Sequence, residues 1–175
     1  MYRVIKALNH NAVLVLDGAS QEYLIMGKGI GFGKKVSERI EPAPDSVVYS
    51  LQSVSERGKA KDLFKEIDPR YLEMADAVLN EAAKEFAHVD RGVLFPMADH
   101  IAFAVSRMRR GEVIANLLTQ DIQVLFYKEF KAASLVRRLL MEEEGLEVPD
   151  DEIGYVALHV HAATAGEKVS SAMQI

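Results

Sequence analysis

Residues 68–87 read DPRYLEMADAVLNEAAKEFA, and this stretch decides the fold because it follows a change from one sequence pattern to another. Asp68 belongs to the residue types that cap helix N-termini, and Pro69 suits the first helical position, where the backbone N–H has no partner within the helix. A helix is therefore predicted to begin at Pro69. The pattern is helical from about residue 58 onwards, whereas the first 50 residues read as short strands.

Later stretches continue the helical pattern. In GVLFPMADHIAFAVSRMRRG, residues 92–111, apolar side chains recur at helical spacing, and basic residues occupy the last turn before Gly111. Residues 113–130 and 131–145 predict one or two more helices. PDDEIGYVALHVHAA, residues 149–163, begins with acids that favour a helix N-terminus. We predict an all-α five-helix bundle of about 110 residues.

Five short runs rich in β-branched and aliphatic residues fill the first part of the chain, separated by turn signals such as the NHN of residues 9–11. Strands about five residues long with tight turns predict a small antiparallel all-β sheet. About 50 residues make a thin core, so we expect this unit to dimerise by packing sheet on sheet. The runs are YRVIKAL (2–8), AVLVL (12–16), QEYLIM (21–26), VSERI (36–40) and SVVYSL (46–51).

Composition narrows the class of protein. The 175 residues are 49% apolar, enough for a sizeable core, and include no cysteine, which excludes a disulfide framework and a thiolate metal site. No signal peptide and no membrane-spanning apolar stretch is visible, so a cytoplasmic protein without membrane insertion is expected. The net charge is −5, but residues 1–55 carry +1 and the remainder carries −6. Only the N-terminal part is expected to meet a polyanion.

The stretch GKGIGFGKK, residues 27–35, combines four glycines and three lysines with Ile30 and Phe32. Its spacing matches neither the phosphate-binding loop of nucleotide hydrolases nor the dinucleotide fingerprint. A loop with solvated lysines is one interpretation, but two large apolar side chains at an exposed tip favour a binding role. A ring that stacks on an unpaired base, lysines that meet phosphates, glycine amides near the backbone and asparagines from the NHN turn describe an RNA-binding platform.

Five histidines occur, and His100 and His159 lie among apolar residues in strongly patterned helices. On pattern alone, a core-flanking imidazole, a metal ligand and a phosphoacceptor all stay open. His159 and His161 are two residues apart, so their side chains point about 200° apart on a helix and cannot chelate one ion together; no metal site is expected. A histidine nitrogen is nucleophilic near neutral pH, because its pKa is about 6.5.

Several stretches together resemble the BglG/SacY family of sugar-responsive transcriptional antiterminators, most of all the glucose-regulon type. VIKALNHNAVLVL and MGKGIGFGKK are similar to the family's RNA-binding co-antiterminator domain, and ADHIAFAVSRMRRG and DEIGYVALHVHAA are similar to two histidine motifs of its PTS regulation domain. The resemblance implies a dimerising four-stranded sheet at residues 1–56, a linker at 57–66 and an all-helical regulation domain at 67–172, the first of two that members usually carry in tandem.

The resemblance also implies a function and its sites. Members bind an mRNA hairpin as a homodimer and prevent an overlapping terminator from forming. Histidine phosphorylation by the sugar phosphotransferase system controls them, so the sugar permease phosphoryl-transfer domain and the phosphocarrier HPr are expected partners. No cofactor and no enzymatic activity is implied. By position, the RNA contacts are Lys6, Asn11, Gly27, Lys28 and Phe32, with Lys28 standing where some members have arginine, and the phosphorylation sites are His100 and His159, with Asp99 supporting the first.

Rival classes of function differ in the residues they need. No Ser/His/Asp order, paired acids in a strong motif or nucleotide loop favours an enzyme. An RNA-binding translational regulator would share the N-terminal half but need no phosphorylatable histidines. A structural dimerisation module without phosphorylation control gives no reason for Phe32 at a loop tip. Binding to a structured RNA hairpin separates the last two classes.

Overall fold

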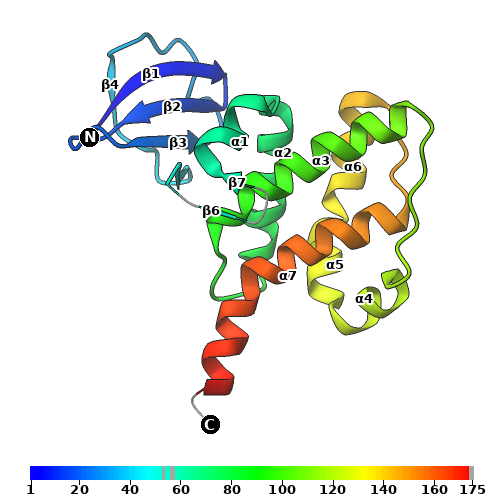
Figure 1. Ribbon diagram of the computed structural model, residues 1–175. Helices are drawn as coiled ribbons and strands as arrows, with labels where there is room; N and C mark the ends of the chain where they lie inside the picture. Colours follow the sequence, from blue (N-terminus) through cyan, green and yellow to red (C-terminus); the bar gives the residue numbers. More distant parts are fainter. Residues whose placement is uncertain (53, 56–57, 174–175) are drawn as a thin grey trace. The chain divides into compact units, whose positions relative to one another are not determined.

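The computed structural model describes residues 1–52, 54–55 and 58–173. The chain divides into two compact units, Met1–Glu73 and Met74–Ile175. Strands come first and helices follow, as Figure 1 shows from blue to red. This order confirms the predicted fold class, an antiparallel sheet followed by a helical part.

The first unit is built on a five-stranded antiparallel sheet in the order β4-β1-β2-β3-β5. Strands β1, β2 and β3 form a meander with short turns and lie side by side in Figure 1. The resemblance implied four strands, and the extra one is the two-residue β4. A strand was predicted over residues 36–40, but only the last two of these residues form one. Ser37 has φ of 71°, which interrupts the extended backbone. The strands are β1 (Tyr2–Asn9), β2 (Ala12–Leu16), β3 (Glu22–Met26), β4 (Arg39–Ile40), β5 (Val47–Ser50), β6 (Val54–Ser55) and β7 (Gly58–Lys59).

One face of this sheet carries a hydrophobic cluster. Val13 and Val15 of β2 point to the same face because residues two apart in a strand do so, and Ile25 of β3 is the register partner of Val13. Ile30 also belongs to the cluster and is only 9% exposed. The prediction that Ile30 sits at an exposed tip is therefore wrong. A tight turn, in which the Ile30 N–H donates to Gly27 O at 3.1 Å, folds the loop so that this side chain reaches the core.

Residues 57–66, expected to be a linker, carry regular structure where they are described. Strand β7 pairs with β6 as a short hairpin, and α1 (Ala60–Glu66) follows at once with Phe64 buried. An ion pair of 3.7 Å joins Lys61 of α1 to Glu22 at the start of β3. A helix with a buried aromatic side chain explains why this segment belongs to the first compact unit.

Helix α2 (Pro69–Ala82) begins at Pro69, which confirms the predicted start. Asp68 Oδ1 accepts a hydrogen bond from the backbone N–H of Arg70 at 2.9 Å, as an N-cap residue does. The other carboxylate oxygen accepts from the Arg70 side chain at 3.0 Å. The local sequence therefore sets both the start of α2 and its cap.

The second unit is helical. Helix α7 packs against α3, α4 and α5, and in Figure 1 it is the long helix that leads to the C-terminus. The apolar side chains that recur at helical spacing in α3 are buried except for Met108, which is half-buried. The buried face of α7 holds Ile153, Val156, Ala157 and Val160. The elements are η1 (Arg91–Val93), α3 (Leu94–Arg109), α4 (Thr119–Leu125), α5 (Tyr127–Ala133), α6 (Leu135–Glu144) and α7 (Asp150–Met173).

The number of helices differs from the prediction. Residues 113–130 form α4 and α5 with a break at Phe126, whose φ and ψ of −120° and 51° are not helical. Helix α6 ends at Gly145, which adopts φ of 66°. From α2 onwards the described residues therefore hold six α-helices where five were predicted. No helix in the described ranges combines the length and apolarity needed to cross a membrane.

Candidate RNA-binding surface and regulatory histidines

The loop after β3 is tied to the turn between β1 and β2. The Gly27 N–H donates to Asn11 O at 3.0 Å, and the Gly31 N–H donates to His10 O at 2.9 Å. The Asn11 side chain adds a third link, because its Oδ1 accepts from the Gly29 N–H at 2.9 Å. The NHN turn and the glycine loop therefore form one hydrogen-bonded surface.

Space requires glycine at two positions of this loop. A Cβ at Gly31 would lie 2.2 Å from Asn9 O, and one at Gly27 would lie 2.8 Å from the Cβ of Ser46. The N–H groups of Gly27, Gly29 and Gly31 all bond within the protein. These glycines shape the loop, and any RNA contact of Gly27 uses atoms other than its N–H.

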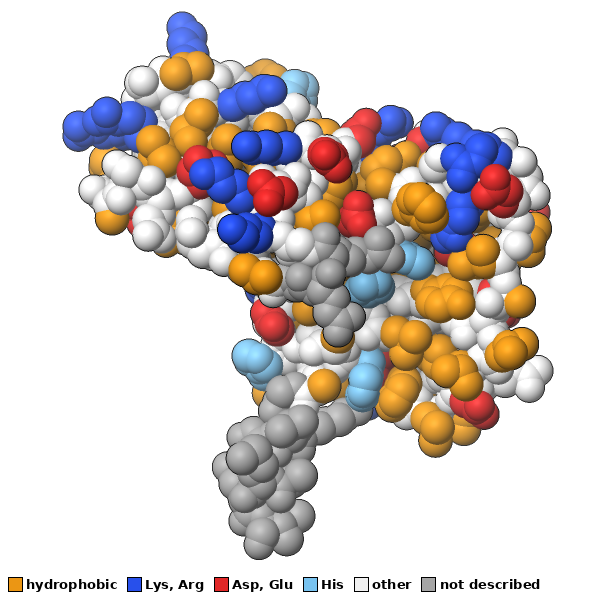
Figure 2. All heavy atoms as spheres, viewed as in Figure 1, with side chains coloured by type: hydrophobic (Ala, Val, Ile, Leu, Met, Phe, Trp, Pro, Cys, Tyr) orange, Lys and Arg blue, Asp and Glu red, His pale blue; other side chains and the backbone are white. Residues whose placement is uncertain are grey.

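Phe32 stands at the outside of the loop, 67% exposed. Its ring meets the His10 ring edge-on, with centroids 5.0 Å apart and planes at 83°. Lys28 in the same loop and Lys6 on β1 are also exposed. On the face seen in Figure 2, Lys and Arg side chains lie over the unit that contains the sheet, with some acidic side chains among them, and others lie over the helical unit. A solvent-facing ring among cations suits a stacked base with phosphates nearby.

Glu73 of α2, within the first compact unit, holds both asparagines of the NHN turn. Its Oε1 accepts from Asn11 Nδ2 at 2.6 Å, and its Oε2 accepts from Asn9 Nδ2 at 3.2 Å. Asn9 Oδ1 in turn accepts from the Asn11 N–H at 2.9 Å. The Asn11 amide is therefore bonded on both sides, to the glycine loop and to a carboxylate.

His100 of α3 and His159 of α7 lie together in the second unit. Their ring centroids are 5.4 Å apart, and the Tyr155 ring lies 5.7 Å from His100. His100 is 7% exposed, whereas His159 is half-buried. Asp99 precedes His100 in α3 and is half-buried. The two predicted phosphorylation sites thus form one site, and the supporting role of Asp99 stays a prediction.

A buried ion pair lies beside His100. Glu152 of α7 accepts two hydrogen bonds from Arg107 Nη2 of α3, at 3.1 and 3.3 Å, and both residues are buried. Glu152 Oε2 also lies 3.6 Å from His100 Nε2. Among the described residues, His100 Nε2 has no hydrogen-bond partner. The face of His100 that carries Nε2 is therefore closed off by a carboxylate.

His161 occupies a different environment from His159. Its Nδ1 lies 3.0 Å from Oε2 of the buried Glu129, and its ring stacks on Phe126 at 4.0 Å between centroids. The expectation that His159 and His161 point to different sides of their helix is therefore confirmed. His161 is fixed by α5 and by the break that precedes it, away from the His100–His159 pair.

Two family models match this chain. The model described as "CAT RNA binding domain" matches residues 2–57, and the one described as "PRD domain" matches residues 72–163. The crystal structure of GlcT CAT-PRDI superimposes with a TM-score of 0.75 at 29% identity, covering 93% of this chain and 98% of that one. The chain belongs to the BglG/SacY family of transcriptional antiterminators. This family consists of RNA-binding regulators of transcription rather than enzymes.

Curated relatives within the antiterminator family are moderately similar. The β-glucoside operon antiterminator of Dickeya chrysanthemi is 28% identical over 99% of this chain, and the transcription antiterminator LicT of Bacillus subtilis is 25% identical over 99%. Protein GlcT of Staphylococcus aureus is 31% identical over 93%. This chain spans 62%, 63% and 58% of the lengths of these three relatives, respectively.

Sequence reasoning missed Glu73 and the Arg107–Glu152 pair. Glu73 lies 62 residues from Asn11, and Glu152 lies 45 residues from Arg107, so no local spacing connects them. The one available signal was that Glu152 falls on the core face of α7, where a charge needs a partner.

Proposed function

We propose that this chain binds an imperfect mRNA hairpin as a homodimer and thereby prevents an overlapping terminator hairpin from forming. The predicted RNA contacts are Lys6, Asn11, Gly27, Lys28 and Phe32. Phosphorylation of His100 and His159 by proteins of the sugar phosphotransferase system controls this binding, in the cytoplasm where nascent mRNA is made.

The single observation that carries the RNA proposal is the exposed Phe32 ring on a loop fixed by hydrogen bonds. An exposed aromatic ring loses apolar burial unless a partner covers it. A base has a flat π-face that can cover it, and Lys28 in the same loop is exposed for a phosphate. The loop is already held by Asn11, so little conformational entropy is lost when RNA binds.

Exposed apolar side chains support association of two copies. The segment around α4 presents an apolar surface to solvent, part of which appears in orange in Figure 2. An apolar surface on a regulatory domain is typical of a protein interface. A two-fold dimer would also present two glycine loops to one RNA. The exposed residues are Val113, Leu117, Leu118, Val124, Leu125 and Tyr127.

The shared site of His100 and His159 supports the regulatory half of the proposal. A phosphoryl group on His100 brings about two negative charges next to the carboxylate of Glu152, and His159 lies beside His100. Unit charges 4 Å apart repel by about 4 kcal/mol at an effective dielectric of 20. Repulsion of that size can shift a dimer between states that differ by a few kcal/mol. Phosphate from the glucose-type permease domain is proposed to oppose RNA binding in this way.

The test is selection of RNA hairpins from a pool with randomised loops and bulges, followed by gel shift with the 175-residue chain. We expect a sequence-dependent complex with two protein chains per RNA, measured by sedimentation. Residues 1–56 alone should bind the same hairpin as a dimer. Binding no tighter than to a perfect duplex of equal length, or tight binding by a monomer, contradicts the proposal.

A further inference from the structure

Arg3 of β1 and Arg39 of β4 are register partners in the antiparallel sheet. Residues directly opposite each other share a face, and like charges in that position destabilise a strand pair. Both side chains are exposed, and within the described ranges no carboxylate forms an ion pair with either guanidinium. Two unpaired cations held side by side at a cost in stability indicate a site for an anion.

A β-bulge brings Lys6 to the same face of the sheet. Residues three apart in a regular strand point to opposite faces. In β1, however, the register shifts between Val4 and Lys6, so that Arg3 pairs with Leu16 and Lys6 pairs with Leu14. Leu14 and Leu16 are two apart on β2 and share a face, so Arg3 and Lys6 share it as well. Lys6, Arg3 and Arg39 thus form one basic row, called the arginine row below.

The arginine row leads away from the glycine loop. That loop bonds to His10 and Asn11, beyond the end of β1, and Lys6 lies between this end and Arg3. The stretch from Asn9 back to Arg3 spans about 20 Å at about 3.3 Å per residue. Each strand of double-stranded DNA carries a phosphate about every 3.4 Å of helix axis, and RNA likewise carries one phosphate per nucleotide. An RNA backbone bound to the loop can therefore also run along this row.

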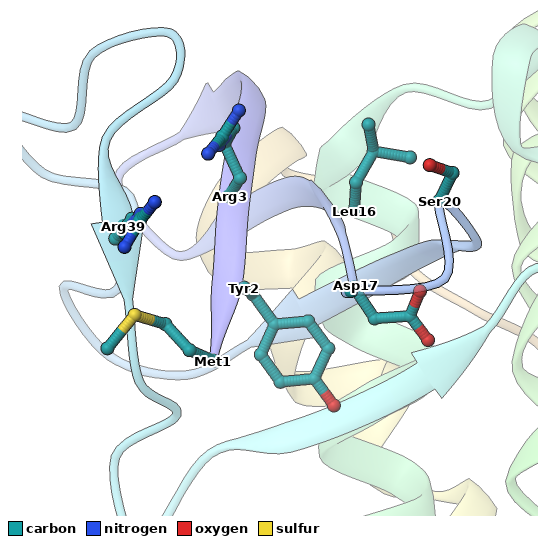
Figure 3. Close-up of a pocket in the computed structure, with 8 residues that line it drawn as sticks. Met1, Tyr2, Arg3, Leu16, Asp17, Ser20 and Arg39 are labelled. Carbon is teal, nitrogen blue, oxygen red and sulfur yellow. The ribbon is translucent and has the colours of Figure 1, made fainter.

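Arg3 and Arg39 line an open depression on neighbouring strands, shown in Figure 3. Asp17 and Ser20 line the same depression. The Asp17 carboxylate is bonded locally, because its Oδ1 accepts the backbone N–H groups of Ala19 at 2.8 Å and Gln21 at 2.9 Å. The two guanidiniums therefore outnumber the one carboxylate, and each presents several donors to phosphate oxygens.

We infer that Arg3 and Arg39 form a second phosphate-binding site for the same RNA, continuing the contact that Lys6 begins. The inference rests on the proposed RNA-binding function. Its chemistry is backbone recognition: the row contacts phosphates of the stem and carries no base specificity.

The experiment measures how the affinity for the selected hairpin depends on salt in the 175-residue chain. Each arginine that loses its phosphate contact should reduce the slope of log affinity against log salt by about 0.7–0.9. We therefore expect Arg3→Ala and Arg39→Ala to bind more weakly and with a flatter salt dependence. The matched control is Lys65→Ala, which removes an exposed positive charge from α1 in the same unit.

Arg39→Glu separates binding from folding. This change replaces a like-charge pair with an ion pair between Arg3 and the introduced carboxylate across the strands, so the unfolding midpoint should stay or rise while RNA affinity falls. A midpoint that drops together with affinity would assign Arg39 to the fold and overturn the inference. If both alanine variants keep the wild-type slope of log affinity against log salt, the inference about Arg3 and Arg39 is overturned. The proposed RNA-binding function still stands in that case, provided that the wild-type chain binds the hairpin. A wild-type chain that binds no selected hairpin overturns both.

Discussion

Glu73 Oε1 accepts a hydrogen bond from Asn11 Nδ2 at 2.6 Å, while Asn11 Oδ1 accepts one from the Gly29 N–H at 2.9 Å. The side chain proposed to read RNA is therefore already bonded to an anionic acceptor. An RNA phosphate or base carbonyl is an acceptor of the same kind, so it competes with the Glu73 carboxylate for the same amide hydrogens.

Glu73→Ala should therefore strengthen RNA binding. The variant releases the amides of Asn9 and Asn11 and removes a negative charge beside the RNA surface. A hydrogen bond to a charged group contributes about 1.5–3 kcal/mol, part of which the RNA must replace, so we expect a gain of roughly fivefold. Gel shift against Glu66→Ala, which removes an exposed acid from α1, gives the matched comparison. Weaker binding would show instead that Glu73 positions Asn11 for RNA.

Phe32→Ala should weaken binding to the selected hairpin by about 1–3 kcal/mol, the scale of one stacked base. The ring is 67% exposed, and among the aromatic rings of the described residues it meets only His10, in a T-shaped arrangement, so the unfolding midpoint should barely change. Val36→Ala, also in this region and 73% exposed, is the control for loss of exposed apolar surface. A large fall in midpoint for Phe32→Ala would place the ring in the core.

Local chemistry predicted part of this molecule well. The start of α2 follows from Asp68 and Pro69 because a cap acts within one turn. Both Phe32 and Ile30 were predicted to be exposed, and this prediction is right for Phe32 and wrong for Ile30. Both side chains are apolar, so only the fold of the turn decides which one points inward.

Features that depend on distant pairing could not be read from the sequence. The bulge after Val4 is defined only by pairing with β2, so the common face of Arg3 and Lys6 was invisible. The proximity of His100 and His159 could not be read from the sequence either, because it arises only where α3 packs on α7. Spacing alone had left their role open.

Asp68 makes the stability of α2 depend on pH. The Arg70 side chain, with help from its backbone N–H, lowers the pKa of the Asp68 carboxyl below its ordinary value. Because the folded-state pKa is lower than the unfolded one, this stabilisation is present above the unfolded pKa of about 3.9 and is lost as pH falls through the folded pKa. The pair is partly exposed, so the effect should stay under about 1 kcal/mol. The free energies of unfolding in urea of wild type and Asp68→Asn should therefore approach each other as the pH falls below about 4. A difference between them that stays constant down to about pH 3 contradicts this assignment.

Glu152→Ala should destabilise the second unit strongly. It leaves the buried Arg107 guanidinium without its carboxylate, and breaking a buried ion pair costs about 3–5 kcal/mol. The double variant Glu152→Leu/Arg107→Met should lose less free energy of unfolding than the sum of the losses of its two single variants, as measured by denaturant unfolding. Glu112→Ala, which breaks the exposed pair with Arg110, should leave the midpoint unchanged. Equal losses for Glu152→Ala and Glu112→Ala would show that the buried pair is not coupled to folding.

The last prediction concerns the order of phosphorylation at the two regulatory histidines. His159 is half-buried, whereas His100 is 7% exposed and its Nε2 lies 3.6 Å from Glu152 Oε2. A phosphoryl donor therefore reaches His159 first, and His100 must wait for α3 and α7 to open locally. Once His159 carries a phosphate, a second one on the neighbouring ring is opposed by charge repulsion, because unit charges at the 5.4 Å that separates the ring centroids repel by about 3 kcal/mol at a dielectric of about 20.

Transfer from purified phosphotransferase proteins should thus give a singly phosphorylated chain, mapped to His159 by mass spectrometry under alkaline conditions that preserve phosphohistidine. In His159→Ala, label should appear on His100 more slowly. His161 is the internal control, because Glu129 binds its Nδ1 and Phe126 covers its ring, so it should stay unmodified. Phosphorylation of His100 and His159 in the same chain at equal rates would contradict the repulsion between the two sites. Label on His161 or His88 alone, with none on His100 or His159, would refute the assignment of the regulatory histidines.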